Sequence, residues 1–339
     1  MKKRYGIYLI LACFTFLSFS IPFALDASNY VKIAVIGEIP RMDKNQEAQK
    51  LVGQVIKFWE KQIAQVLFSK PDLIVLPEAC DRPAGMDREE QFNYYNVRKD
   101  QVKEYFASVS KENRCYIAFG TKHQAKDGNW YNSSVVLDRD GRTAGVYNKN
   151  FPTIGEMESG IKAGDEVPVI QCDFGRVACA ICFDLNFPEL LEKYQGAKPD
   201  LILFSSMYHG GLVQSYWAYS CRSFFVGAIG GKRNPSEIRD PLGDVVASTT
   251  NYFNYTVAKI NLDFRLVHLD YNWEKLDRLK EKYGEAVTVK DPGRVGAVLV
   301  TSNDETKTVD QMLGEFNIEL LDDYFDRSRK FRLEPGNIK

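Results

Sequence analysis

The sequence predicts an α/β fold built on mixed β-sheets. Short runs of apolar and β-branched residues alternate with longer segments in which apolar residues recur at helical spacing. Strand pairs joined by tight turns interrupt this alternation, as at Asp138-Arg139-Asp140-Gly141. Helices between strands favour parallel pairing and hairpins require antiparallel pairing, so both are expected. With 339 residues, of which 45% are hydrophobic, the chain is long enough to bury a large core, as one large domain or two ordinary ones.

The first half of the chain contains strands and helices in alternation. The helix over 45–68 follows from apolar residues at helical spacing, and the strand over 73–76 follows from a β-branched run after Pro71-Asp72. A second helix is expected over 95–111. The remaining strands are expected at 31–36, 115–120, 130–137 and 143–147.

The second half repeats this rhythm and then becomes more charged. Pro188 suits the first turn of a helix over 188–196, and a second helix is expected over 212–225. Strands are expected at 167–172, 176–181, 201–204, 226–230, 245–249 and 255–262. Beyond 264 we predict a helix over 272–283, a strand pair at 286–290 and 295–301, and a final helix. We expect residues 264–339 to be an extension that packs on the body or across a dimer.

The N-terminus has the order of a secretory signal peptide. Basic residues at 2–4 precede an apolar stretch over 7–23, and small residues follow, with cleavage expected between Ala24 and Ala27. We therefore assign 1–27 to a signal and predict export to the periplasm or the medium. An uncleaved anchor is an alternative, because the apolar run approaches the roughly 18 residues that span a bilayer. A lipoprotein form is disfavoured, because the apolar run continues past Cys13.

Charge and cysteine content exclude several classes of function. The formal net charge is −1 and neither sign forms a long block, which argues against nucleic-acid binding and favours a small-molecule or protein substrate. An even number of cysteines after the signal permits disulfides in an exported protein, but most of them lie in apolar runs where cysteine packs as a small hydrophobe. The spacing of Cys179 and Cys182 is that of a redox motif, yet the pair ends a strand and does not begin a helix.

Three reactive side chains directly follow predicted strands: Glu78, Lys149 and Cys182. Strand ends can hold such groups rigidly at a sheet edge. A free thiol is mostly protonated at neutral pH, so attack by Cys182 needs a base or a nearby cation. Glu78 could take the thiol proton and return it to a leaving amine. Lys149 and a backbone N–H, that of Phe183, could hold the negative oxygen of a tetrahedral intermediate.

The order and neighbours of these residues resemble the nitrilase superfamily of carbon–nitrogen hydrolases, in its amidase- and carbamoylase-like branch. The resemblance covers 30–262 and rests on Leu76-Pro77-Glu78, Tyr147-Asn148-Lys149, Cys182-Phe183-Asp184 and Phe187-Pro188-Glu189. It implies that Glu78 is the general base, Lys149 the oxyanion cation and Cys182 the nucleophile. It also implies a four-layer α-β-β-α sandwich with mixed sheets, in subunits that pair through helices as a homodimer or higher homo-oligomer. We assign 28–263 to this domain.

The resemblance also implies a second glutamate, which follows the lysine and positions the reacting groups. The candidates are Glu156 and Glu158, and we favour Glu156 because Pro-Thr-x-x-Glu after the lysine is the more familiar form.

The chain has three histidines, which limits the alternatives. A papain-like hydrolase needs a histidine beside the thiol, and neither His123 nor His268 has a catalytic setting. His209, preceded by Tyr208, follows a predicted core strand and is either a substrate contact or an ordinary loop histidine. Closely spaced pairs of metal-binding residues are lacking apart from the one Cys-x-x-Cys, so we expect no metal and no cofactor.

The predicted function is hydrolysis of a small amide or N-carbamoyl compound through a thioester on Cys182, with release of ammonia or an amine. Nitrilase-branch members usually follow the cysteine with Trp-Glu, whereas this chain has Phe183-Asp184. Nitrile hydrolysis by the same three residues and a non-catalytic, ligand-binding descendant remain alternatives. Specificity is expected to come from loops at 82–93 and 208–215 and from the region after 264.

Overall fold

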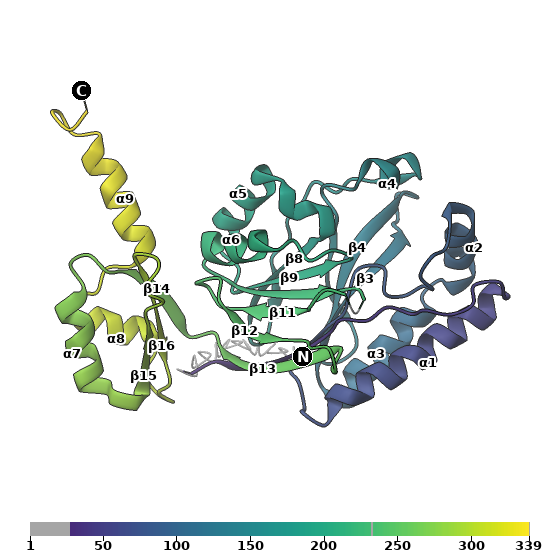
Figure 1. The fold of residues 1–339 in the computed structure, drawn as a ribbon, viewed down its shortest axis with the longest axis horizontal. Coiled ribbons are helices and arrows are strands. Elements are labelled where there is room, and N and C mark those ends of the chain that lie inside the picture. The colour runs from purple at the N-terminus through teal and green to yellow at the C-terminus, as the bar shows by residue number, and fades with distance from the viewer. Residues whose placement is uncertain (1–27, 232, 339) are drawn as a thin grey trace, which may run out of the picture.

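The computed structural model describes residues 28–231 and 233–338 as an α/β structure in which two packed sheets carry helices on their outer faces (Figure 1). The predicted signal segment at 1–27 lies outside the described residues, so export and its alternatives remain predictions. Within the described residues, no helix combines the length and the apolar character needed to cross a membrane.

The first sheet has seven strands in the order β13-β1-β2-β3-β4-β5, with β6 beside β4. The strands β1, β2 and β3 pair in parallel. Antiparallel pairs join β13 to β1, β4 to β3, and β5 to β4. Their bounds are β1 Tyr30–Ile36, β2 Leu73–Val75, β3 Tyr116–Gln124, β4 Trp130–Leu137, β5 Thr143–Asn148, β6 Ile161–Lys162 and β13 Tyr255–Asn261. The predicted mixture of parallel and antiparallel pairing is confirmed.

The second sheet has six strands in the order β12-β11-β10-β9-β8-β7. Its central strands β8, β9 and β10 are parallel, and antiparallel strands flank them. Their bounds are β7 Ile170–Cys172, β8 Gly175–Ile181, β9 Leu201–Ser206, β10 Phe224–Ile229, β11 Glu237–Arg239 and β12 Val245–Ser248. The sequence prediction missed β11, because three residues are too few to show an alternating pattern.

Helices cover the outer face of each sheet, and apolar cores fill the three spaces between layers. On the first sheet, α1 (Ala48–Leu67) buries Val55, Trp59 and Ile63, which recur every fourth residue, and α3 (Gln101–Asn113) packs beside it. On the second sheet, α5 (Pro188–Ala197) and α6 (Leu212–Cys221) enclose another core. The inner faces of the two sheets form the third core. The four-layer α-β-β-α sandwich is therefore confirmed.

One predicted helix is in fact two, because α2 (Arg88–Arg98) ends before α3 begins. Lys99 has φ 44°, which stops α2, so the single helix predicted over 95–111 is wrong at its start. The N-terminus of α2 is fixed by a capping box: Asp87 Oδ1 accepts from Glu90 N at 2.9 Å, and Glu90 Oε2 accepts from Asp87 N at 2.7 Å. Much of the loop predicted at 82–93 is thus helical.

The end of α6 is also earlier than predicted. Arg222 has φ 56°, which stops the helix at Cys221 where the prediction placed its end at 225. The chain then enters β10 at Phe224.

The C-terminal region contains a third sheet, in the order β14-β16-β15, with its own apolar core. Its elements and the helices beyond are β14 Phe264–His268, α7 Trp273–Tyr283, β15 Val287–Lys290, β16 Ala297–Ser302, α8 Val309–Glu315 and α9 Leu321–Arg332. The predicted strand pair and helix appear as β15, β16 and α7, whereas β14 and α8 were not predicted. Figure 1 shows α9 extending away from this sheet.

Contacts join the third sheet to the rest of the chain. Phe264 and Leu321 belong to the core between the two large sheets. Lys290 pairs with Asp244 at 2.9 Å, and Arg222 Nε lies 3.1 Å from Asp322 Oδ1. The division of the chain at residue 263 stays a prediction, as does packing across a dimer.

Candidate active site

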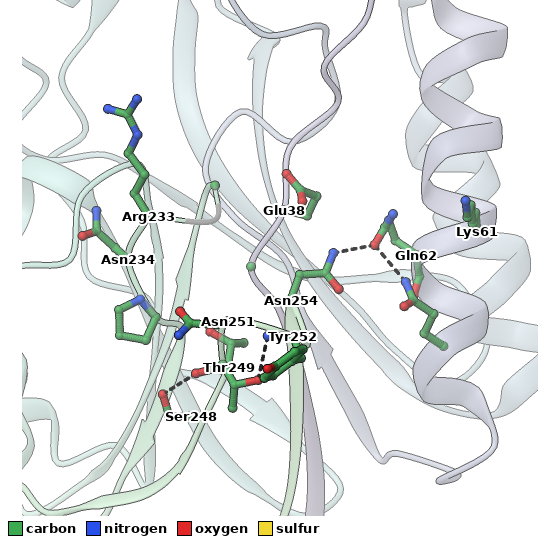
Figure 2. Close-up of a pocket in the computed structure, with 15 residues that line it drawn as sticks. Glu38, Lys61, Gln62, Arg233, Asn234, Ser248, Thr249, Asn251, Tyr252 and Asn254 are labelled. Carbon is green, nitrogen blue, oxygen red and sulfur yellow. Dashed lines mark hydrogen bonds between the residues drawn. The ribbon is translucent and has the colours of Figure 1, made fainter.

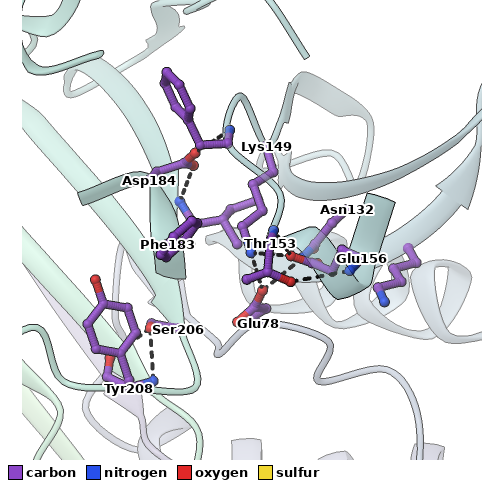
Figure 3. A network of polar contacts seen from close by, with 12 residues as sticks. Glu78, Asn132, Lys149, Thr153, Glu156, Phe183, Asp184, Ser206 and Tyr208 are labelled. Carbon is purple, nitrogen blue, oxygen red and sulfur yellow. Dashed lines mark hydrogen bonds and ion pairs between the residues drawn. The ribbon is translucent and has the colours of Figure 1, made fainter. Parts of the chain in front are cut away.

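The segments that follow β2, β5 and β8 meet between the two large sheets (Figure 3). Ser205 Oγ, at the end of β9, donates to Leu76 O at 2.9 Å and so ties the second sheet to the segment after β2. Tyr147 OH, on β5, donates to Asp184 Oδ2 at 2.8 Å and ties the first sheet to the segment after β8. The topology therefore brings Glu78, Lys149 and Cys182 into one region.

Glu78 is held by close backbone packing. Its side chain is buried, and the next residue, Ala79, has φ 47°. A Cβ on Gly120 of β3 would lie only 2.5 Å from Glu78 Cα, so glycine is required at position 120 for the backbone to approach this closely. The carboxylate thus projects from a tightly packed turn.

Lys149 is the central cation of the site and is 1% exposed. Its Nζ lies 3.1 Å from Glu78 Oε1 and 2.8 Å from Glu156 Oε2. Burial alone would lower the pKa of Lys149, but the two carboxylates outweigh this effect and raise it. The side chain is therefore an ammonium at neutral pH.

Glu156 completes the cluster and lies on α4 (Ile154–Glu158). Thr153 caps this short helix, and Glu156 Oε2 accepts from Thr153 N at 2.9 Å. Burial would raise the pKa of Glu156, but the neighbouring ammonium of Lys149 and the hydrogen bonds lower it. Of the two candidate glutamates, Glu156 is the one that pairs with Lys149.

Asn132 on β4 connects the two carboxylates. Its Nδ2 donates to Glu78 Oε1 at 2.8 Å and to Glu156 Oε1 at 2.7 Å. The sequence placed Asn132 only in a core strand. Side chains along β4 alternate between the two faces of the sheet, so Asn132 lies on the same face as Val136. Because Val136 packs between the two sheets, this alternation could have placed Asn132 there as well.

Cys182 begins a single 3-10 turn (Cys182–Asn186) directly after β8. Its φ of 46° is a left-handed conformation that costs a non-glycine residue energy, and such strain is concentrated at functional sites. Cys182 is half-buried, while the other five cysteines of the described residues are buried, and all six are free. The most accessible of these thiols is thus the one at the strand end.

Burial dominates the electrostatics of the Cys182 thiol and, with the charge of Glu78, raises its pKa to about 12. The charge of Lys149, the hydroxyl of Ser206 and the backbone of Met207 act in the opposite direction. The thiol is therefore protonated at rest, and a base must remove the proton as the sulfur attacks. Ser206, which sequence reasoning missed, also accepts from Tyr208 N at 3.0 Å.

This balance predicts the effect of Glu78→Gln on thiol reactivity. Because the charge of Glu78 raises the pKa of Cys182, its removal should shift the pH profile of iodoacetamide alkylation to lower pH than in the wild-type protein. The rate would be followed by mass spectrometry of the peptide that contains Cys182. Glu158→Gln is the matched control and should leave the profile in place. A shift of the alkylation profile to higher pH in Glu78→Gln would contradict the proximity of the Glu78 carboxylate to the thiol of Cys182.

Asp184 secures the turn that starts at Cys182. Its Oδ2 accepts from Ile181 N at 2.8 Å, and its Oδ1 accepts from Phe151 N at 2.9 Å. Burial raises the pKa of Asp184 to about 6, although these donors oppose the shift. The N–H of Phe183 lies in the first turn of a helix, where amides lack intrahelical acceptors.

The two predicted substrate contacts lie after β9. Tyr208 OH accepts from Asn186 Nδ2 at 3.2 Å. His209 Nδ1 accepts from Gly211 N at 3.0 Å, so Nε2 carries the proton and donates to Glu237 Oε2 at 3.1 Å. Both ring nitrogens of His209 thus have partners within the chain, and its contact with a substrate stays a prediction.

A separate polar cavity of about 610 Å³ lies between α1 and the loops after β1, β10 and β12 (Figure 2). Glu38, Gln62, Arg233 and Asn254 are among its lining residues, which include no cysteine. The Lys149 cluster is therefore kept as the candidate active site. Among the residues that the structure describes, no group of three or more His, Cys, Asp or Glu side chains could hold a metal ion.

Sequence comparisons place the chain among known hydrolases. The family model described as carbon–nitrogen hydrolase matches residues 32–263. A hydrolase of Schizosaccharomyces pombe is 23% identical over 220 residues, which cover 56% of this chain and 66% of that protein, slightly less than two thirds of its length. The omega-amidase of Homo sapiens is 23% identical over 224 residues, which cover 62% of this chain and 80% of that protein.

Solved structures agree on the fold. Nit3 of Saccharomyces cerevisiae, described as a member of branch 10 of the nitrilase superfamily, has a TM-score of 0.58 at 16% identity, covering 79% of this chain and 97% of that one. An amidase from Nesterenkonia, solved with acrylamide added to its active-site cysteine, has a TM-score of 0.58 at 13% identity, covering 73% and 99%. Together with the matched family model, these comparisons show that the chain belongs to the carbon–nitrogen hydrolase family of the nitrilase superfamily.

Proposed function

We propose that this protein hydrolyses a small amide or N-carbamoyl compound through a covalent thioester on Cys182. The observation that supports this most strongly is the buried ion-paired cluster of Glu78, Lys149 and Glu156. The charges of Glu78 and Lys149 in this cluster act on the thiol of Cys182. A buried lysine between two carboxylates costs desolvation energy, and such groups concentrate where they serve a function.

In the proposed first half-reaction, Glu78 takes the proton of the thiol as the sulfur of Cys182 attacks the carbonyl carbon. The electron pair of the C=O bond moves to the oxygen, and the ammonium of Lys149 and the N–H of Phe183 stabilise the resulting oxyanion. When the C–O double bond re-forms, the C–N bond breaks. Glu78 gives its proton to the leaving nitrogen, and the acyl group remains on sulfur as a thioester.

In the proposed second half-reaction, Glu78 activates a water molecule that attacks the thioester carbon. The same two donors hold the second oxyanion. The C–S bond then breaks, the proton held by Glu78 returns to the sulfur, and the carboxylic acid leaves. Glu156 and Asn132 do not react in this scheme. Their contacts hold the carboxylate of Glu78 and the ammonium of Lys149 in position.

We propose an amide and not a nitrile as the substrate for two reasons. The residues after Cys182 are Phe183-Asp184 and not the Trp-Glu that is usual in the nitrilase branch. In addition, the relatives named above include an omega-amidase and an amidase. Nitrile hydrolysis by the same residues remains the second candidate.

The test is ammonia release by the full-length protein from a panel of linear amides, ureido acids and nitriles. We expect turnover of at least one amide or ureido acid, and acid quenching in the steady state should trap an acyl group on the peptide that contains Cys182. Acrylamide should also form an adduct at Cys182. Turnover of nitriles alone would favour the second candidate, and no turnover of any compound would exclude the hydrolase.

A further inference from the structure

The polar cavity beside α1 has no role in the proposed mechanism, yet it lies where α/β sheets commonly bind ligands (Figure 2). Glu38 follows β1, and Gly231 follows β10. Both strands have parallel neighbours, and ligands bind outside the carboxyl ends of such strands. A Cβ on Gly37 would lie 2.4 Å from Ser236 Oγ and 3.1 Å from Ile229 O, so glycine lets the ends of β1 and β10 approach closely. The cavity is therefore built into the packing of the two sheets.

The lining of this cavity is polar and mostly uncharged. Nine of the fifteen described residues that line it carry an amide or a hydroxyl group, and Glu38, Lys61 and Arg233 bring charges of both signs. Glu38 repels an anion, whereas Lys61 and Arg233 repel a cation. The volume of about 610 Å³ lies within the range of small-molecule sites. Such a lining suits an uncharged ligand that carries many hydroxyl groups.

Hydrogen bonds within the lining determine which atoms are left for a ligand. Gln62 Oε1 accepts from Asn254 Nδ2 at 2.7 Å and from Gln65 Nε2 at 2.9 Å (Figure 2). These contacts leave Nε2 of Gln62 to donate and Oδ1 of Asn254 to accept. Glu38 is 6% exposed, and its carboxylate accepts one hydrogen bond among the residues that the structure describes, from Ile39 N at 3.2 Å. A carboxylate has room for further donors, so the cavity offers both acceptors and a donor.

Two aromatic side chains are exposed on the loop at the rim of the cavity. Tyr252, which lines the cavity, is 91% exposed, and its neighbour Phe253 is 56% exposed. Thr250 holds this loop, because its Oγ1 accepts from Tyr252 N at 3.2 Å and from Phe253 N at 3.1 Å. The ring of a tyrosine has an apolar face and a polar tip. It therefore matches a sugar ring, whose C–H groups form an apolar face between hydroxyl groups.

We propose that this cavity binds an uncharged saccharide, with Tyr252 against one face of a sugar ring. Gln62 donates to hydroxyl groups of the sugar, and Glu38 and Asn254 accept from them. A hydroxyl group donates and accepts at once, so a single sugar unit satisfies the donor and the acceptors of the lining together. Cys182 is not among the lining residues. The saccharide is therefore bound without being cleaved, and the inference goes beyond the proposed function.

The first test measures binding to the full-length protein by calorimetry. The uncharged probes are the methyl glycosides of glucose, galactose, mannose and N-acetylglucosamine. Methyl glucuronide and methyl glucosaminide are charged probes of the same shape, one anionic and one cationic. We expect saturable binding of at least one uncharged glycoside and weaker binding of the two charged ones. Binding of no uncharged glycoside, or tighter binding of a charged one, would overturn the saccharide site.

Two variants test the position of the bound glycoside. Tyr252→Ala removes an exposed ring and should raise the Kd about 5- to 10-fold while the thermal unfolding midpoint stays unchanged. Glu38→Gln keeps the shape of the side chain and should raise the Kd about 10-fold, because the charged acceptor is lost. Tyr271→Ala is the matched control, since Tyr271 is 73% exposed and does not line the cavity. Wild-type affinity in both cavity variants would overturn the assignment.

The Cys182→Ala variant separates this cavity from the candidate active site. It should bind the same glycoside with the wild-type Kd, because Cys182 does not line the cavity. Loss of binding in this variant would show that the glycoside occupies the candidate active site and would overturn the cavity assignment. Glycoside binding by a wild-type protein that hydrolyses no amide, ureido acid or nitrile would support the saccharide site and overturn only the hydrolase.

Discussion

The Cys182→Ala variant should lose turnover of every amide that the wild-type protein hydrolyses, by roughly 10⁴-fold or more. Without the sulfur no thioester forms, and the remaining residues can only polarise the carbonyl group. The variant should stay folded, because Cys182 is half-buried and takes no part in a disulfide. The measurement is ammonia release together with the thermal unfolding midpoint of the same preparation.

Cys221→Ala is the matched cysteine control for this variant. Cys221 is buried at the end of α6 and lies outside the site, so its loss leaves a small cavity and lowers the free energy of unfolding by about 1 kcal/mol. Turnover per folded molecule should stay at the wild-type level. If Cys182→Ala retained turnover, or if Cys221→Ala abolished it in a folded protein, the nucleophile would be assigned to the wrong cysteine.

The Lys149→Met variant should lose both turnover and stability. The side chain of Lys149 is 1% exposed, and those of Glu78 and Glu156 are 8% and 15% exposed. Removal of the cation leaves two buried carboxylates without their partner, which costs about 3–5 kcal/mol in the free energy of unfolding. Turnover falls as well, because the oxyanion loses its charged donor. Urea unfolding at pH 7 gives the first quantity and ammonia release the second.

The stability loss in Lys149→Met should also depend on pH. In the wild-type protein the pKa of Glu156 is lowered, so its contribution to stability is present above its unfolded pKa and is lost as the pH falls through its folded pKa. In the variant this contribution is missing at every pH. The difference between the two proteins should therefore shrink as the solution is acidified.

Two further variants control the Lys149→Met experiment. Lys149→Met combined with Glu156→Gln removes one of the uncompensated charges and should recover part of the lost stability. Lys162→Met removes an exposed lysine on β6 and should change the free energy of unfolding by less than about 0.5 kcal/mol. A loss in Lys149→Met no larger than that in Lys162→Met would contradict the buried ion pair.

The sequence was sufficient for the parts of the fold that have strong local patterns. Most large-sheet strands are runs of apolar residues ended by turn residues, and α1 shows its buried face at every fourth position. By contrast, α2 has few apolar residues, so its periodicity is weak, and the prediction did not use the capping residues Asp87 and Glu90 at its start. The short strand β14 and helix α8 lie in a charged region and depend on contacts between distant segments.

The residues of the candidate site likewise include some that the sequence could predict and some that it could not. Glu78, Lys149 and Cys182 each follow a recognisable strand, so their position could be predicted, and their proximity followed from the resemblance. Asn132 lies within a strand, and its place in the site depends on the register between β3 and β4, which a single sequence does not specify.

The division of the site between the two sheets has a consequence for folding. Glu78 and Lys149 follow strands of the first sheet, whereas Cys182 follows a strand of the second, and the hydrogen bond from Tyr147 to Asp184 crosses between them. Under the proposed mechanism, a nascent chain with only one sheet formed therefore has either a nucleophile without its base or a base without its nucleophile. Enzymatic activity thus serves as an assay for docking of the two halves, and its recovery during refolding should coincide with burial of the core between them.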